Sequence, residues 1–260
     1  MRAIVTTSRK YSRRNGEIAE ETAKRLNLPQ VERGRESVTE LKEKYDADFV
    51  LVARKNTLYL CGGEQGDIFF HPGMAHLRLK NLREGKGDRM TEAMDLTEGA
   101  NVLDCTLGMG ADAIVAASVT KVKVTALEIN PLLAELMRFS LKNFPAENEK
   151  LKTAMENIEV ITADYRDFLS VQDDNSFDVV YFDPMFRHPF TDSAAINPLR
   201  AAACSAPLSP FALAAAKRVA KERVVLKETS KSREFARLGF GETAGGKYSK
   251  IRYGIIRTHS

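Results

Sequence analysis

A short motif at residues 183–186 carries the clearest chemistry in this sequence. Asp183, Pro184, Met185 and Phe186 follow the apolar run Phe177–Phe182, which predicts a buried strand. The Asp183 carboxylate and the Pro184 carbonyl oxygen can each accept one N–H of a planar amino group, which would orient the nitrogen lone pair toward an electrophile. Phe186 offers a ring on which an unstacked base could rest. The plain alternative is an Asp-Pro turn that closes the strand.

A second candidate site is the glycine-containing loop after the expected strand Val102–Cys105. Gly108 and Gly110 let the backbone turn sharply, and with Ala113 they match the G-x-G-x-x-G/A pattern of dinucleotide-binding loops. Glu128 stands 20 residues after Gly108, where a carboxylate can accept both hydroxyls of an adenosine ribose. The loop and the acid predict an adenosine-containing cofactor, and the alternative is a tight turn with a solvated Glu.

Two further carboxylates favour S-adenosylmethionine (SAM) over NAD as that cofactor. Asp104 stands at the carboxyl end of its expected strand, where its charge suits the cationic methionyl end of SAM and would repel a pyrophosphate. Asp164 follows the expected strand 158–162 and could accept the adenine amino group. Open α/β sheets bind ligands at the carboxyl ends of their strands. We therefore predict SAM, with an NAD(P)-dependent oxidoreductase as the alternative.

Alternating strands and helices must position these residues. From Asn101 onward the apolar spacing changes repeatedly between the period of a strand and that of a helix. This alternation predicts an α/β fold with a doubly wound, Rossmann-like, mostly parallel sheet that ends in an antiparallel strand pair. The expected strands are 102–105, 122–128, 158–162, 177–182, 223–227, 240–243 and 251–257, and the expected helices are 111–119, 131–143 and 212–221.

The chain before this region is expected to form a small basic α/β module over residues 1–72. Its expected strands are 3–7, 48–53 and 57–61, and its expected helices are 16–26 and 38–45. Residues 73–90 crowd basic side chains and glycines and predict a linker, which leaves 91–260 as the catalytic domain. Residues 1–90 hold 18 Lys and Arg against 13 Asp and Glu, so the whole chain's net charge of +4 originates in its first third. A local basic excess is typical of proteins that contact a polyanion.

Together these motifs resemble the class I SAM-dependent methyltransferases, and more narrowly the bacterial small-subunit ribosomal RNA guanine-N2 methyltransferases, the RsmJ-like family. The similarity extends from about Gly73 to the C-terminus. Its specific segments are 73–76 (GMAH) and 183–186 (DPMF), whereas the glycine loop is common to many methyltransferases. The resemblance implies transfer of a methyl group from SAM to an exocyclic base amine of RNA. It also implies cofactor contacts at 111–112, at 128–129 and at Asp183.

The chain departs from this family at three positions. An Arg is usual where Ala111 stands and another where Ile129 stands, and Arg187 follows Phe186 where the family has a proline. These departures leave the target nucleotide open.

The sequence thus predicts three sets of site residues. The predicted catalytic residues are Asp183, Pro184, Met185 and Phe186. The predicted cofactor-binding residues are Asp104, Thr106, Gly108, Gly110, Ala111, Asp112, Glu128, Ile129, Asn130, Asp164 and Asp183. The predicted RNA-binding residues are Arg9, Lys10, Arg13, Arg14, His76, Arg78, Lys80, Arg83, Lys86, Arg187 and His188.

Composition and local sequence patterns argue against several other classes of protein. A chain with 43% hydrophobic and 28% charged residues is not wholly disordered, and no stretch approaches the roughly 20 apolar residues of a membrane span. The N-terminal residues show no secretory signal, and Cys61, Cys105 and Cys204 have no metal spacing, so we expect a cytoplasmic protein without a metal site. The open alternatives are a methyltransferase acting on a small molecule or a protein amide nitrogen and a non-catalytic RNA-binding protein. The oligomeric state is left open.

Overall fold

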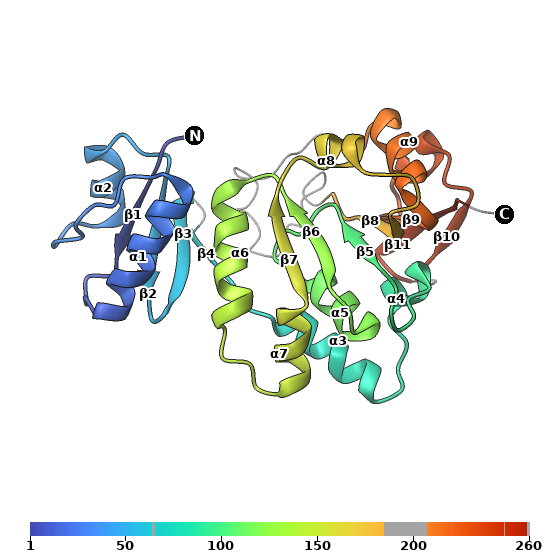
Figure 1. Cartoon of the computed structure of the whole chain (residues 1–260), viewed down its shortest axis with the longest axis horizontal. Coiled ribbons are helices and arrows are strands. Elements are labelled where there is room, and N and C mark those ends of the chain that lie inside the picture. Colours follow the sequence, from blue (N-terminus) through green and yellow to red (C-terminus); the bar gives the residue numbers. More distant parts are fainter. Residues whose placement is uncertain (64–65, 185–206, 247, 259–260) are drawn as a thin grey trace. The chain divides into compact units, whose positions relative to one another are not determined.

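The computed structural model of the chain describes residues 1–63, 66–184, 207–246 and 248–258 (Figure 1). The described residues form two compact units. The first consists of Met1–His71 and Asn130–Pro145, and the second of Pro72–Ile129, 146–184, 207–246 and 248–258.

The first unit contains a four-stranded sheet in the order β1-β2-β3-β4. Strands β1 and β2 are parallel, and β2, β3 and β4 are successively antiparallel. Its core includes Ile4, Leu41, Val50 and Cys61. The elements are β1 (Ala3–Thr7), α1 (Arg13–Leu26), α2 (Val38–Lys44), β2 (Phe49–Arg54), β3 (Thr57–Gly63) and β4 (Gly66–Phe69). Strand β4 was not expected from the sequence.

Helix α6 (Pro131–Asn143) completes the first unit. Its N-cap is Asn130, whose side-chain oxygen accepts hydrogen bonds from the backbone N–H groups of Leu132 and Leu133, and Pro131 occupies the tolerated first turn. Although α6 lies between two strands of the second unit in sequence, it packs against β3 and α1.

The second unit contains a seven-stranded sheet in the order β10-β11-β9-β8-β5-β6-β7. Strands β5 to β9 are parallel, β11 is antiparallel to β9, and β10 is antiparallel to β11. This arrangement confirms the predicted doubly wound fold. The strands are β5 (Val102–Asp104), β6 (Val124–Glu128), β7 (Ile158–Thr162), β8 (Phe177–Phe182), β9 (Ala220–Thr229), β10 (Glu242–Ala244) and β11 (Ile251–Arg257).

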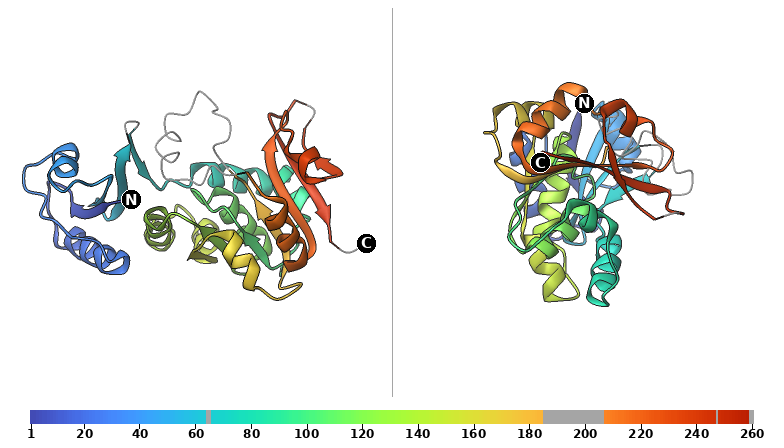
Figure 2. Two further views of the ribbon diagram at one scale, coloured as in Figure 1. Left: turned by 90° about the horizontal axis from the view of Figure 1, so that it is seen from above. Right: turned by 90° about the vertical axis from the view of Figure 1, so that its right-hand side faces the viewer.

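Helices cover both faces of this sheet (Figure 2). Helices α3, α4 and α5 pack together on one face, and α8 and α9 pack together on the other. Leu103, Val180, Phe182 and Val224 are fully buried under these helices. The helices are α3 (Gly73–Arg83), α4 (Arg89–Met94), α5 (Ala111–Thr120), α7 (Glu149–Glu156), α8 (Tyr165–Val171), α9 (Pro210–Val219) and α10 (Glu234–Leu238).

Residues 73–90, which we expected to form a linker, are largely helical. Ala75, Leu79 and Leu82 recur at spacings of four and three residues, which is the apolar stripe of a helix, and Ala75 is fully buried. The crowding of Lys, Arg and Gly obscured this weak stripe. Asp88 then caps α4 by accepting a hydrogen bond from the backbone N–H of Thr91. In the part of the chain that the structure describes, no helix has the length and apolar character to span a membrane.

Candidate functional site

The register of the sheet brings the predicted acidic residues to one edge. Asp104 ends β5 and pairs with Tyr181 on β8 and with Ala126 on β6. Glu128 ends β6, and Asp183 comes directly after β8. Because these strands are parallel neighbours, their carboxyl ends lie together, as the sequence predicted.

The glycine loop between β5 and α5 depends on glycine for its shape. Gly108 and Gly110 have φ angles of 50° and 73°, in the left-handed region that disfavours residues with a Cβ. Gly110 forms the N-cap of α5. The backbone N–H of Gly108 donates to the Glu128 carboxylate over 3.3 Å. The loop is therefore fixed to the end of the neighbouring strand by the acid predicted to bind ribose.

Thr106 connects this loop to the predicted catalytic motif. Its backbone N–H donates to Oδ1 of Asp104 over 2.9 Å, and its hydroxyl accepts a hydrogen bond from the backbone N–H of Asp183 over 2.6 Å. The position of the Asp183 backbone is thus set relative to Asp104.

Lys227 forms ion pairs with two carboxylates at this edge, those of Asp183 and Asp112. Phe182 on β8 pairs with Leu226 on β9, so the next residues, Asp183 and Lys227, lie side by side. Lys227 Nζ donates to Oδ2 of Asp183 over 2.7 Å and to Oδ2 of Asp112 over 2.8 Å. Asp112, in the first turn of α5, also accepts from the Tyr181 hydroxyl over 2.8 Å.

Arg78 on α3 extends this network. Its guanidinium donates to Oδ2 and Oδ1 of Asp88 over 2.7 and 2.9 Å, and it also forms an ion pair with Asp112. Only 18% of the side chain of Arg78, a predicted RNA-binding residue, is exposed, and its guanidinium contacts Asp88 and Asp112.

Burial and charge pairing give these carboxyl groups different acidities. Burial raises the pKa of Asp104 to about 7, opposed by the Thr106 N–H and reinforced by Asp112 and Asp183. Burial also raises the pKa of Asp183 to about 6, against the attraction of Lys227. Burial acts the same way on Asp112, but Lys227 and Arg78 outweigh it and hold the pKa of Asp112 well below its ordinary value.

The charges of this cluster fit a cationic cofactor. The carboxyl groups of Asp88, Asp104, Asp112 and Asp183 face the cations of Arg78 and Lys227, so acidic groups outnumber basic ones. SAM carries a sulfonium and an ammonium group that this surplus would attract, whereas the pyrophosphate of NAD would be repelled. The residues present therefore fit SAM.

Other predicted cofactor residues also have side-chain partners within the protein. Asn130 caps α6, with Oδ1 2.9 Å from the N–H of Leu132. Asp164 caps α8 and accepts from Nε of Arg166 over 2.9 Å. Ala111 is the first residue of α5, and the Ile129 side chain is exposed.

Part of the prediction lies outside the described residues. Met185 and Phe186 of the catalytic motif fall there, as do the predicted RNA contacts Arg187 and His188.

The remaining predicted RNA-binding residues are divided between the two units. Arg9, Lys10, Arg13 and Arg14 are exposed in the first unit, where Arg13 and Arg14 form ion pairs with Glu17. His76, Lys80, Arg83 and Lys86 belong to α3 or directly follow it. Among the described residues, no cluster of His, Cys, Asp and Glu has the composition to hold a metal ion.

Sequence reasoning missed three residues of the network, namely Lys227, Tyr181 and Asp88. Lys227 had a signal, because it is a polar residue at the carboxyl end of the buried strand 223–227, as Asp183 is after 177–182. Tyr181 and Asp88 had none, since each is defined by contacts with a residue distant in the sequence.

Comparison with known proteins decides the family. The model of a family described as "Putative SAM-dependent methyltransferase" matches residues 35–250. The chain belongs to this family of SAM-dependent methyltransferases. Its cofactor is SAM, so the alternative of an NAD(P)-dependent oxidoreductase is set aside.

Relatives of this methyltransferase differ in the share of the chain over which they are similar to it. The "Uncharacterized protein YpiP" of Bacillus subtilis (strain 168) is 36% identical over 258 residues, covering 98% of this chain and 99% of its own. The "Ribosomal RNA small subunit methyltransferase J" of Vibrio campbellii is 34% identical over 160 residues, covering 58% of this chain and 61% of its own. The crystal structure of the SAM-dependent methyltransferase NGO1261 from Neisseria gonorrhoeae superposes with a TM-score of 0.68 at 18% identity, over 98% of this chain and 96% of that one, which supports the fold.

Proposed function

We propose that this methyltransferase modifies an exocyclic amine of an RNA base, most specifically N2 of a guanine in small-subunit ribosomal RNA, in the cytoplasm. Partial similarity to the Vibrio campbellii protein, whose name gives small-subunit ribosomal RNA as its substrate, supports this substrate class. The Asp183-Pro184 pair after β8 supports the chemistry.

The observation that carries the proposal is the way Asp183 is held. Its backbone N–H donates to the Thr106 hydroxyl, and its Oδ2 accepts from Lys227. These two contacts fix both ends of the residue. We assign its Oδ1, together with the Pro184 carbonyl oxygen, to the two N–H groups of the substrate amine.

The reaction needs orientation more than it needs a strong base. The lone pair of an amine attached to a base is delocalised, so the amine is a weak nucleophile. Two acceptors at Asp183 and Pro184 would turn that lone pair out of the ring plane and toward the electrophile. SAM, when bound, supplies an electrophilic methyl group on its sulfonium. The amine becomes acidic after transfer, and a carboxyl group whose pKa is about 6 can accept its proton near neutral pH.

The test is methyl transfer from labelled SAM to small-subunit ribosomal RNA, followed by mass spectrometry of the digested nucleosides. We expect N2-methylguanosine from the wild type. Asp183→Asn should lower kcat by about 10²–10³-fold, while SAM affinity stays within a few fold, because Lys227 would attract the amide oxygen and leave the substrate facing an amide nitrogen that cannot accept an N–H. Asp173→Asn, which changes an exposed carboxylate, is the matched control and should stay fully active.

Two results would overturn the proposal. Full activity of Asp183→Asn would remove Asp183 from the reaction. Methylation of a small molecule or a protein amide in preference to RNA would keep the chemistry but replace the substrate class.

A further inference from the structure

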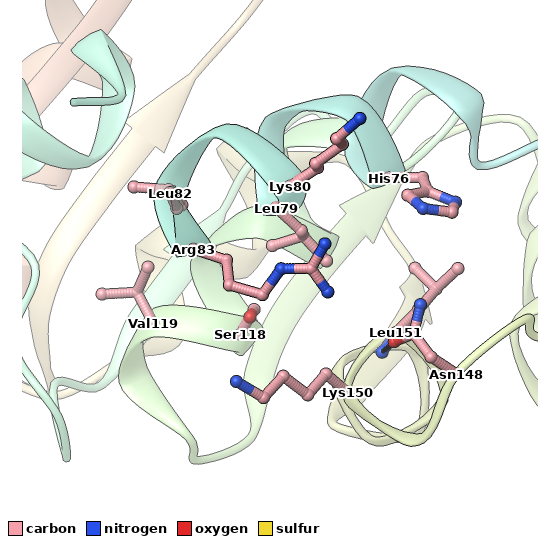
Figure 3. Close-up of a pocket in the computed structure, with 10 residues that line it drawn as sticks. All are labelled: His76, Leu79, Lys80, Leu82, Arg83, Ser118, Val119, Asn148, Lys150 and Leu151. Carbon is pink, nitrogen blue, oxygen red and sulfur yellow. Dashed lines mark hydrogen bonds between the residues drawn. The ribbon is translucent and has the colours of Figure 1, made fainter. Parts of the chain in front are cut away.

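A groove within the second unit lies between α3, the end of α5 and the start of α7 (Figure 3). Its volume of about 210 Å³ is several times the roughly 30 Å³ that one water molecule occupies. Leu79, Leu82, Val119 and Leu151 line it with apolar surface. The groove can therefore take a ligand group much larger than water.

Cations from two elements reach across this groove. Arg83 on α3 and Lys150 on α7 extend from opposite sides, with Ser118 of α5 between them (Figure 3). Within the described ranges, neither Arg83 nor Lys150 forms an ion pair with a carboxylate. Their positive charges are thus left for an anionic ligand.

The edge of the groove carries further charges of both signs. His76 and Lys80 share the face of α3 that bears Arg83, at spacings of four and three residues. His76 Nδ1 lies 3.3 Å from Glu147, and Lys80 Nζ lies 4.0 Å from Glu84. The exposed Lys80–Glu84 pair is weak, so an approaching phosphate can compete for the Lys80 ammonium group.

The groove is separate from the methyl-transfer site. Asp112 of that site stands at the start of α5, and Ser118 of the groove stands six residues further along, roughly 9 Å along the helix axis. A ligand group in the groove would therefore not belong to the nucleotide at Asp183.

We propose that this groove binds the sugar-phosphate backbone of the RNA substrate, at a segment away from the methylated nucleotide. The inference rests on the proposed function. Arg83 and Lys150 hold the phosphate, and the leucines pack against the sugar. Contacts to phosphates position a nucleic acid without reading its sequence, so the groove contributes RNA affinity and not the choice of base.

The experiment compares Arg83→Gln/Lys150→Gln with the wild type for binding of a fluorescein-labelled transcript of bacterial small-subunit ribosomal RNA, measured by anisotropy over a series of salt concentrations. We expect about tenfold weaker binding at low salt. The slope of log affinity against log salt should fall by roughly 1.4 to 1.8, for two lost phosphate contacts. SAM affinity, measured by calorimetry, should not change.

A matched control removes two charges elsewhere in the same unit. Lys217 and Lys231 are exposed, and within the described ranges neither forms an ion pair, so Lys217→Gln/Lys231→Gln has the same net charge as the groove variant. This control should bind RNA nearly as the wild type does. An equal loss in both double variants would show a general charge effect and overturn the proposal.

The remaining outcomes separate this proposal from the proposed function. If the groove variant binds RNA as tightly as the wild type while ribosomal RNA is still methylated, the groove proposal alone fails. If the wild type neither binds nor methylates the transcript, both fail. Binding of adenosine monophosphate that the groove variant loses, with RNA affinity unchanged, would assign the groove to a free nucleotide instead.

Discussion

At the scale of single residues, Lys227 strongly affects the ionisation of Asp183, the residue proposed to act in methyl transfer. It is the cation that contacts Asp183, and its other carboxylate partner is Asp112. Burial of Asp183 and the negative charge of Asp112 on α5 oppose Lys227, because both raise the pKa of Asp183. Lys227 therefore stabilises the ionised form of Asp183 more than any other contact among the described residues.

Lys227→Met should shift the acid limb of the pH-rate profile. In the proposed reaction Asp183 must be ionised, so the wild-type rate should fall as the pH drops through about 6. Removing the ammonium group removes the attraction that opposes burial, so the pKa of Asp183 rises and the midpoint moves to higher pH. Single-turnover rates between about pH 5 and 9 measure this shift.

Lys227→Arg serves as its control, because it keeps the positive charge and should hold the midpoint near the wild-type value. An unchanged midpoint in Lys227→Met, with circular dichroism showing a native fold, would remove Lys227 from this role.

The sequence was enough to place one class of candidate residue in the fold. Acidic residues at strand ends, such as Asp104, Glu128 and Asp183, can be located because a buried strand is recognisable and its next polar residue marks the end. The side chains that contact the acidic residues of this site could not be identified in the same way. Arg78 lies 34 residues from Asp112 in sequence, and only the packing of α3 against α5 brings them together.

At the scale of secondary structure, α6 shows how a residue predicted to bind the cofactor can have a structural task. Asn130 is buried, and its Oδ1 accepts from two backbone N–H groups at the start of α6. Those N–H groups would otherwise lack partners in the helix.

Asn130→Ala should destabilise the protein by about 1 kcal/mol, measured as a lower midpoint of urea unfolding, because the N-cap is lost. Asn130→Asp keeps an acceptor at the favourable end of the helix dipole and should unfold near the wild-type midpoint. A loss of SAM affinity in Asn130→Ala without any loss of stability would instead support a direct cofactor role.

Long apolar patterns made most elements predictable, whereas short ones did not. The predicted helix 131–143 and strands 158–162 and 177–182 match α6, β7 and β8. The five-residue α10 and the four-residue β4 are too short to show a period, and α3 has its apolar stripe among basic residues. The helices α7 and α8 each have a clear polar cap, Asn148 and Asp164, which sequence reasoning did not use.

At the scale of the whole molecule, the predicted RNA-binding residues do not belong to one module. Arg9, Lys10, Arg13 and Arg14 lie in the first unit, whereas Lys80, Arg83 and Lys86 lie in the second. The charge count along the sequence located the basic excess in residues 1–90. It could not show which of these residues belong to which unit, because that assignment depends on tertiary contacts.

Removal of residues 1–71 should expose the apolar face of α6, which packs against β3 in the intact protein. Leu132, Leu133 and Leu136 are buried, and exposed leucines lower solubility and bind hydrophobic dyes. We expect the truncated chain to show higher anilinonaphthalene sulfonate fluorescence and a lower Tm than the full chain. A soluble truncated chain with neither change would mean that α6 does not depend on the first 71 residues.

The path of the chain through its two units also governs how a protease can divide it. The chain leaves the first unit after His71, returns to it at Asn130 and leaves again after Pro145. A single cut between residues 71 and 72 would therefore not release the N-terminal residues, because they remain packed against a helix that is covalently joined at both ends to the rest of the protein. We therefore expect residues 1–71 to stay bound to the rest of the enzyme after such a cut.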